Sequence, residues 1–227
     1  MVSAIIVAAG SGKRMGGEIE KQFLPLCGFP LLKHTLQVFE DCDRIDQILP
    51  VLPKEKIEYC KKEILHKFGF QKVLEPIAGG ERRQDSVYEG LLRIRGGLIL
   101  IHDGARPLLP PELLIRLIQE CSSHPAVIPV IEAGDTLKRL KGGFVVETMD
   151  RSKIQGAQTP QGFEYSLIRK AYDRAYKEGA AVTDDSTLVE RLGIQVKGIE
   201  GSPENIKITT KADLLFAEAI LRNRSGI

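Results

Sequence analysis

Short apolar runs alternate with longer segments of helical period along the first 130 residues of the chain. Short continuous apolar runs are typical of buried strands, and an apolar residue every three or four positions is typical of an amphipathic helix. Apolar runs lie at 4–8, 47–52, 72–77, 98–102 and 126–130, and segments of helical period at 31–39, 54–68, 86–94 and 111–121. This alternation predicts an α/β fold in which helices flank a Rossmann-like, mostly parallel sheet.

The pattern changes after residue 130, where two short runs surround the dipeptide Gly142-Gly143. Residues 135–140 and 144–149 are expected to form a β-hairpin, a protruding arm at about 132–150. Because an isolated two-stranded hairpin is marginally stable in water, we expect the arm to pack on a second copy of the chain or on its own domain.

Strands and helices alternate again after the arm. We expect helices at 163–178, 184–192 and 210–222 and strands at 195–198 and 206–209, with Asp184 in the position of a helix N-cap. A chain of 227 residues is long enough for one domain with a sizeable core. Residues 1–227 are therefore expected to form a single domain that carries the arm.

Charge and cysteine content narrow the possible partners and compartment. With 32 Lys and Arg against 30 Asp and Glu, the net charge of +2 is too small for a general binder of nucleic acid or of a membrane surface. The four cysteines are far apart and form no C-x-x-C pair, which favours reduced thiols and a cytoplasmic protein. No apolar run approaches the length of about 20 residues that spans a bilayer.

A glycine-rich, basic segment follows the first apolar run. Residues 8–16 are Ala-Ala-Gly-Ser-Gly-Lys-Arg-Met-Gly, and Lys21 follows them. Glycines let backbone N–H groups approach an anion, and lysine and arginine add positive charge, so the segment can hold phosphates. A dinucleotide fingerprint would need a glycine in place of Met15. A P-loop would need a glycine in place of Val7 and Ser or Thr in place of Arg14, so neither motif is present.

A second polar cluster, Gly-Gly-Glu-Arg-Arg-Gln-Asp-Ser-Val at 79–87, closes one predicted strand and opens a helix. Free N–H groups of the Gly-Gly turn can recognise the edge of a base. Ser86 in the first helical turn can donate to a base, a ribose or a phosphate. Asp85 and Ser86 could equally be plain helix caps.

The third cluster, His-Asp-Gly-Ala-Arg-Pro at 102–107, also follows a predicted strand directly. Asp103 is suited to hold Mg²⁺ or a substrate hydroxyl. Arg106 could stabilise the loop by pairing with Asp103, and His102 is the weaker candidate, since a histidine that ends a strand is more often a hydrogen-bonded core residue. Carboxyl ends of parallel strands meet at one edge of a sheet, so the three clusters should face a common crevice.

Several later polar clusters have simple structural explanations when taken one at a time. Lys207 is of most interest, because a lysine at the end of an expected strand can reach the same crevice. The clusters are Asp135-Thr136, Asp150-Arg151 and the segments 158–161, 183–186 and 205–209.

Taken in chain order, these motifs closely resemble those of the 2-C-methyl-D-erythritol 4-phosphate cytidylyltransferases of the non-mevalonate isoprenoid pathway, over essentially the whole chain. The motifs are AAGSGKRM with the following lysine, GGERRQDSV, HDGARP, DT, DR, QTPQ, TDDS and NIKIT. One departure is the pair Arg82-Arg83, where the family pattern more often has Glu-Arg. The resemblance implies a nucleotidyltransferase-type fold, CTP and a polyol phosphate as substrates, Mg²⁺ or another divalent cation as cofactor, and a homodimer with exchanged arms.

The resemblance also implies roles for individual residues. Arg14, Lys21 and Lys207 would be catalytic, and Asp103 would bind the metal. CTP would contact Ala8, Ala9, Gly10, Ser11, Gly12, Gly80, Glu81, Ser86, Asp103 and Gly104. The acceptor would contact Asp103, Arg106, Thr136, Arg151, Thr159, Thr183 and Lys207, with Thr136 expected from the partner's arm.

The implied reaction fits these charged loops. Attack of an acceptor phosphate on the α-phosphorus of CTP brings two anions together, so positioning and positive charge must supply most of the catalysis. Two alternatives stay open. A ribitol 5-phosphate cytidylyltransferase would share the CTP half of the site, and a nucleotide-binding regulator would keep the fold without the chemistry.

Overall fold

A mixed sheet forms the centre of the molecule. The structure is a computed structural model that describes residues 1–10 and 20–225. Within these residues the central sheet has eight strands. Seven of them pair in the order β10-β7-β11-β6-β1-β4-β5, and the eighth, β12, also pairs with β7. The strands are β1 Val2–Val7, β4 Gln47–Leu52, β5 Ile77–Ala78, β6 Leu98–Asp103, β7 Ala126–Glu132, β10 Gln155–Ala157, β11 Gln161–Glu164 and β12 Lys197–Glu200.

Most strand pairs are parallel, as the sequence predicts. In the central sheet, β1 runs parallel to β4 and β6, β4 runs parallel to β5, and β12 runs parallel to β7. Strand β11 lies between β6 and β7 and is antiparallel to both, and β10 is antiparallel to β7. The mostly parallel α/β fold class is therefore confirmed, with an antiparallel insertion beside the central strands.

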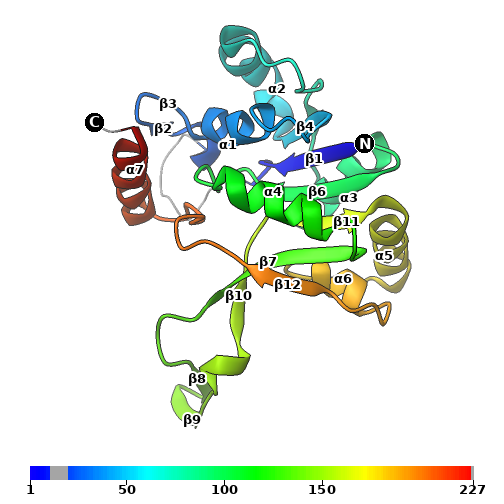
Figure 1. Ribbon diagram of the computed structural model, residues 1–227, viewed down its shortest axis with the longest axis vertical. Helices are drawn as coiled ribbons and strands as arrows, with labels where there is room; N and C mark the ends of the chain where they lie inside the picture. The colour runs from blue at the N-terminus through cyan, green and yellow to red at the C-terminus, as the bar shows by residue number, and fades with distance from the viewer. Residues whose placement is uncertain (11–19, 226–227) are drawn as a thin grey trace.

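Helices cover both faces of the sheet, and the alternation of side chains along β1 shows why (Figure 1). Ala4 and Ile6 belong to one buried cluster and Ile5 to the other, and all three are fully buried. Successive strand residues point to opposite faces, so β1 needs an apolar layer on each side. Helices α1 (Leu31–Glu40) and α4 (Pro111–Glu120) supply one layer. Helices α3 (Arg83–Arg93), α5 (Tyr165–Glu178) and α6 (Ser186–Glu190) supply the other.

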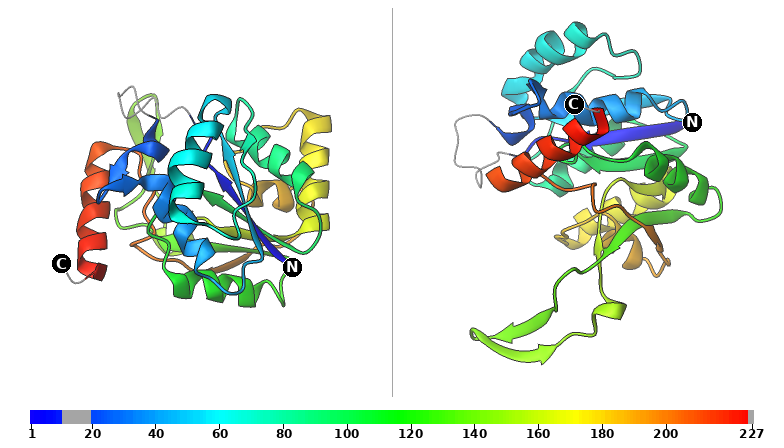
Figure 2. Two further views of the ribbon diagram at one scale, coloured as in Figure 1. Left: turned by 90° about the horizontal axis from the view of Figure 1, so that it is seen from above. Right: turned by 60° about the vertical axis from the view of Figure 1, so that its left-hand side comes forward.

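The remaining elements lie at the periphery. The expected helix at 54–68 is one helical segment of changing pitch, made of η3 Lys54–Lys56, α2 Ile57–Cys60 and η4 Lys61–His66. Helix α7 (Lys211–Ser225) packs beside the short strands β2 (Pro25–Leu26) and β3 (Phe29–Pro30) through a small apolar cluster (Figure 2). Among the described residues, no helix is long and apolar enough to cross a membrane.

The expected hairpin arm is present. Strands β8 (Lys138–Lys141) and β9 (Phe144–Thr148) pair antiparallel around Gly142 and Gly143, whose φ angles of +58° and +84° suit glycine. The arm projects away from the sheet and its helices (Figures 1 and 2). Every residue of the two strands is exposed.

Several expected elements differ in the structure, and the strand expected at 195–198 is found two residues later as β12. The apolar run 72–77 is largely irregular, with a bridge between Ile48 and Val73 and then the two-residue β5, because Pro76 has no N–H for the ladder. The expected strand 206–209 forms no strand, and this segment is held by the Ile208 N–H, which donates to the Ala105 carbonyl at 2.9 Å.

The expected helix 163–178 begins two residues later, at Tyr165, because its first residues belong to β11. The N-cap position of α6 is Asp185, one residue after the expected Asp184, but it is the Asp184 carboxylate that accepts from the first turn, with its Oδ1 accepting the Thr187 N–H at 3.1 Å.

Gly162 generates a prediction about core packing. A Cβ at this position would lie 2.5 Å from Cys121 Sγ and 3.3 Å from Leu100 Cδ2. Gly162→Ala should therefore lower the free energy of unfolding by about 1–3 kcal/mol. Cys121→Ala in the same chain removes the closest clashing atom and should recover part of that loss. Urea denaturation of the two single variants and the double variant measures the coupling, and strictly additive effects would contradict this packing.

Candidate active site

A cavity of about 220 Å³ opens at the carboxyl ends of β1, β5 and β6. This is the crevice that the sequence predicts, since the segments after these strands all contribute to its wall. Its lining residues are Val7, Ala8, Ala9, Gly10, Lys21, Gln22, Gly80, Glu81, Arg82, Arg83, Ser86, Asp103, Ala105 and Lys207. Among them four side chains are cationic and two are anionic, so the described wall carries an excess of positive charge.

Two glycines allow the loops to approach one another closely. A Cβ on Gly79 would lie 2.4 Å from Ala9 Cβ and 2.6 Å from Ser86 Oγ. A Cβ on Gly104 would lie 2.7 Å from Ala8 Cβ. All three distances are shorter than real Cβ contacts, so only glycine fits at the two positions where the loops after β5 and β6 pack on the segment after β1.

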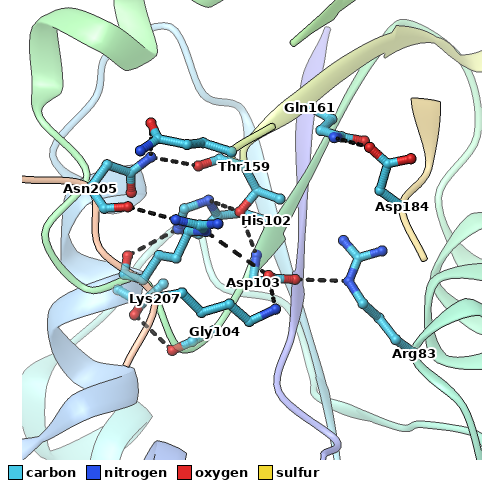
Figure 3. A network of polar contacts seen from close by, with 12 residues as sticks. Arg83, His102, Asp103, Gly104, Thr159, Gln161, Asp184, Asn205 and Lys207 are labelled. Atoms are coloured by element: carbon cyan, nitrogen blue, oxygen red, sulfur yellow. Dashed lines mark hydrogen bonds and ion pairs between the residues drawn. The ribbon is translucent and has the colours of Figure 1, made fainter. Parts of the chain in front are cut away.

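Asp103 ends β6 and is the charged centre of the site (Figure 3). Its Oδ1 accepts from Arg83 Nε at 2.8 Å, and its Oδ2 lies 2.6 Å from Lys207 Nζ. Burial alone would raise the pKa of this carboxyl, but the charges of Arg83 and Lys207 hold the pKa well below its usual value. Asp103 is therefore ionised at neutral pH.

Arg83 is held on its other side by Asp185, which is completely buried. Arg83 Nη1 and Nη2 donate to the two carboxylate oxygens of Asp185 at 3.1 and 2.8 Å. Tyr172 Oη donates to Asp185 Oδ1 at 2.5 Å. The guanidinium group is thus fixed by carboxylates at both ends, and its plane and direction are set before any ligand binds.

His102 is a buried structural residue. Thr159 Oγ1 accepts the Asp103 N–H at 3.1 Å, so its own hydroxyl proton is free to donate to His102 Nδ1, also at 3.1 Å. His102 Nε2 then donates to the Arg106 carbonyl at 3.1 Å, which makes this imidazole the neutral Nε2–H tautomer. Burial lowers the pKa of His102 to about 4.

Arg106 supports the loop after β6 chiefly through the backbone. Its Nη1 donates to the Asn205 carbonyl at 2.6 Å, whereas its Nε lies 4.0 Å from Asp103 Oδ2. Asn205 Nδ2 donates to the Thr159 carbonyl at 2.8 Å. These contacts tie the loop after β6 to the two segments that carry Thr159 and Lys207 (Figure 3).

Asp85 is a helix cap, one of the two roles that the sequence allows. Its Oδ2 accepts the Arg82 N–H at 3.0 Å, and its Oδ1 accepts from Tyr176 Oη at 2.5 Å. The Arg82 side chain also donates to this carboxylate, and these hydrogen bonds hold the pKa of Asp85 well below its usual value. Asp85 therefore fixes the start of α3, from which Arg83 and Ser86 reach the cavity.

The structure brings together many of the residues to which the sequence gives a role. Nine of them line the cavity: Ala8, Ala9, Gly10, Lys21, Gly80, Glu81, Ser86, Asp103 and Lys207. Gly104, Arg106 and Thr159 adjoin it through the network around Asp103. Ser11, Gly12 and Arg14 lie outside the described residues. The roles of all of these residues stay predictions.

Three expected acceptor residues lie outside this cavity. Thr136 and Arg151 are exposed at the base of the arm, where Arg151 Nη1 donates to the Gly134 carbonyl at 3.4 Å. Thr183 is exposed in the turn before α6. Sequence reasoning missed the part played by Arg83 and Asp185. Arg83 could be noticed in the sequence as the second arginine of a pair, but its partner Asp185 lies 102 positions away in the chain, so no local pattern connects the two residues.

The mostly parallel sheet with helices on both faces is an α/β fold of the nucleotidyltransferase type. Residues 2–223 match the family described as IspD, 2-C-methyl-D-erythritol 4-phosphate cytidylyltransferase, and the chain belongs to that family.

Curated relatives and solved structures agree with this assignment. The chain is 45% identical over 226 residues to the 2-C-methyl-D-erythritol 4-phosphate cytidylyltransferase of Geotalea uraniireducens, a match that covers 98% of this chain and 97% of the relative. It is 47% identical to that of Geobacillus kaustophilus, with 97% of each chain covered. The 4-diphosphocytidyl-2C-methyl-D-erythritol synthase structure from Anaerococcus prevotii superposes with a TM-score of 0.86 at 34% identity and covers 98% of both chains.

The buried imidazole generates a prediction about pH. In the unfolded chain His102 titrates near 6.5, whereas in the folded chain it titrates near 4. Between these values the unfolded state binds more protons, so the stability that is present above pH 6.5 is lost as the pH falls. Between pH 7.5 and 5 this residue should account for a loss of about 2 kcal/mol in the free energy of unfolding.

Urea denaturation at the two pH values, compared between the wild type and His102→Gln, isolates this contribution. The variant cannot titrate at this position and should show the smaller loss. An NMR titration of the wild-type imidazole provides a second measurement, and protonation of the folded protein above pH 6 would contradict the assignment.

Proposed function

We propose that this protein transfers the cytidylyl group of CTP to the phosphate of 2-C-methyl-D-erythritol 4-phosphate, forming 4-diphosphocytidyl-2-C-methyl-D-erythritol and pyrophosphate. The observation that carries the proposal is the cavity at the strand ends of a member of this family, where Arg83 and Lys207 pair with Asp103 and Lys21 lines the same wall. The charge excess of the cavity suits polyanionic substrates.

The chemistry requires positioning more than an activated side chain. A phosphomonoester is largely ionised near neutral pH, so the acceptor oxygen can attack the α-phosphorus without a protein base. His102 is unsuited to that role, because it is neutral and both its ring nitrogens are already hydrogen-bonded. The cationic side chains reduce the repulsion between the two anions and stabilise the charge of the transition state.

Individual roles follow from these positions. Residues 8–12 would cradle the triphosphate while Arg14 and Lys21 hold the phosphates at the reacting centre. Gly80, Glu81 and Ser86, on the loop after β5 and the start of α3, would recognise the base, with Asp103 and Gly104 completing the nucleotide site. Lys207 would hold the acceptor phosphate, assisted by Arg106, Thr136, Arg151, Thr159 and Thr183.

The arm suits an exchange between two copies of the chain. Leu140, Phe144, Val145 and Val146 are exposed by 55–78% on its two strands, an unusual share of apolar surface for an isolated hairpin. We propose a homodimer with exchanged arms, in which Thr136 and Arg151 reach the acceptor site of the partner. Residues 1–227 would then form one domain with an arm at about 132–150, working in the cytoplasm without a nucleic-acid or membrane partner.

The site also fits Mg²⁺. This ion usually takes one or two carboxylates together with waters and substrate phosphates, and Asp103 and Glu81 are the two carboxylates among the described lining residues. No group of three His, Cys, Asp or Glu residues that could hold a metal occurs in the described part of the chain, so the triphosphate would have to complete the ligand set. When bound, the ion would neutralise phosphate charge.

A comparison of acceptors tests the proposed function. Pyrophosphate release from CTP and Mg²⁺ should be faster with 2-C-methyl-D-erythritol 4-phosphate than with ribitol 5-phosphate, measured as kcat/KM in a coupled assay. A higher kcat/KM with ribitol 5-phosphate would contradict the assignment of 2-C-methyl-D-erythritol 4-phosphate and identify ribitol 5-phosphate as the acceptor. Absence of release with both acceptors would favour a nucleotide-binding regulator.

Lys21→Ala should lower kcat by about 10²–10³-fold, because a cation placed against the developing phosphate charge is lost. The fold should survive, since Lys21 lies on the cavity wall outside the buried clusters. Lys54→Ala is the matched control, because it removes the same charge from an exposed position of η3. Turnover near the wild-type value in Lys21→Ala would count against its catalytic role.

A further inference from the structure

Gln22 has an unsatisfied amide in the wall of the cavity. It lies in η2 (Lys21–Phe23), directly after Lys21, and its side chain is 1% exposed. Neither Nε2 nor Oε1 has a hydrogen-bond partner among the described residues, although the residue lines the cavity. It is the one described residue with both polar side-chain atoms buried and unpartnered.

Such an amide is unfavourable unless another molecule completes its hydrogen bonds. A buried polar group without a partner loses its hydrogen bonds to water and gains none in return, so these groups are rare in native structures. Gln84 shows that this chain can satisfy a similarly buried amide, since it is 5% exposed. Its Nε2 donates to the Ala180 carbonyl at 3.0 Å, and its Oε1 accepts the Val182 N–H at 3.3 Å. The unsatisfied state of Gln22 therefore indicates that a ligand completes it.

The charges of the cavity indicate the chemistry of that ligand. Lys21, Arg82, Arg83 and Lys207 outnumber Glu81 and Asp103 among the described lining residues, so an anion is favoured. Phosphate oxygens that carry no proton only accept hydrogen bonds, and the amide Nε2 of Gln22 supplies a neutral donor beside the charge of Lys21.

We propose that Gln22 is a further binding residue for the phosphate chain of the nucleotide, with Nε2 donating to a phosphate oxygen. Its Oε1 accepts from a hydroxyl or a water that enters with the nucleotide. This inference rests on the proposed use of CTP and adds a neutral contact that the positive charges do not provide. The amide of Gln22 therefore lowers the stability of the ligand-free protein and raises its affinity for the nucleotide.

The variant Gln22→Met tests both the predicted cost to stability and the predicted gain in affinity, because methionine has a similar shape and no amide. The urea midpoint of the ligand-free protein should rise. Binding of CTP and of pyrophosphate, measured by calorimetry, should weaken by about tenfold or more. Gln22→Glu provides a second variant, in which a carboxylate replaces the donor and should weaken both ligands further through repulsion.

Gln84→Met is the matched control for stability, since it removes a buried amide whose two ends are bonded and should lower the midpoint. A lower midpoint in Gln22→Met, or unchanged CTP affinity, would overturn the inference. Weaker CTP binding with unchanged pyrophosphate binding would also overturn it, because the contact would then lie with the nucleoside. A wild-type protein that releases pyrophosphate from CTP would preserve the proposed function in each of these cases.

Discussion

The buried carboxylate of Asp103 is the constraint on which the site depends. A carboxylate that is removed from water is unfavourable unless opposite charges and hydrogen bonds replace its hydration. Here each oxygen has its own cation, Arg83 at 2.8 Å and Lys207 at 2.6 Å. These partners come from the start of α3 and from the segment before α7, so satisfying one charge brings together three distant parts of the chain.

A neutral network beneath Asp103 fixes the backbone that carries it. The Asp103 N–H, the Thr159 hydroxyl and the His102 imidazole form a chain of hydrogen bonds with one consistent direction, which ends at the Arg106 carbonyl. The chain requires a neutral imidazole, and burial against Phe39, whose ring centroid lies 5.1 Å away, keeps it neutral. The hydrogen-bonded chain directly beneath the Asp103 backbone is therefore polar but uncharged.

Prediction from the sequence succeeded where a pattern is local. Strands β1, β4 and β6 are buried on both faces, so their near-continuous apolar runs identify them, and their carboxyl ends locate the three polar loops. Strands β10 and β11 were missed, because Gln155–Ala157 and Gln161–Glu164 each contain a glycine and little apolar alternation. A glycine is needed within β11 at position 162 because the Cys121 side chain leaves no room for a Cβ, and this contact is visible only in three dimensions.

In the site, too, only local patterns could be recognised from the sequence. Residues that follow a strand could be recognised singly, but the pairing of Arg83 with Asp185 joins positions 102 residues apart and has no local pattern. The Gly-Gly turn was expected to serve base recognition, whereas Gly79 is also required for close packing against Ala9 and Ser86. Sequence reasoning thus found most of the groups that face the cavity and the local supports Asp85, His102 and Arg106, but it missed the long-range pair of Arg83 and Asp185.

The two cations of Asp103 differ in what they can do when a substrate arrives. Arg83 is held by Asp103 and Asp185 together, and a guanidinium group with both edges occupied has little freedom to turn. Lys207 ends in a compact ammonium group on a flexible stem, and its side chain is 36% exposed. An incoming phosphate can therefore share or replace Asp103 as the partner of Lys207, while Arg83 continues to neutralise the carboxylate. The site can accept a second anion without leaving the first one unpaired, which is the requirement that a reaction between two phosphate groups imposes.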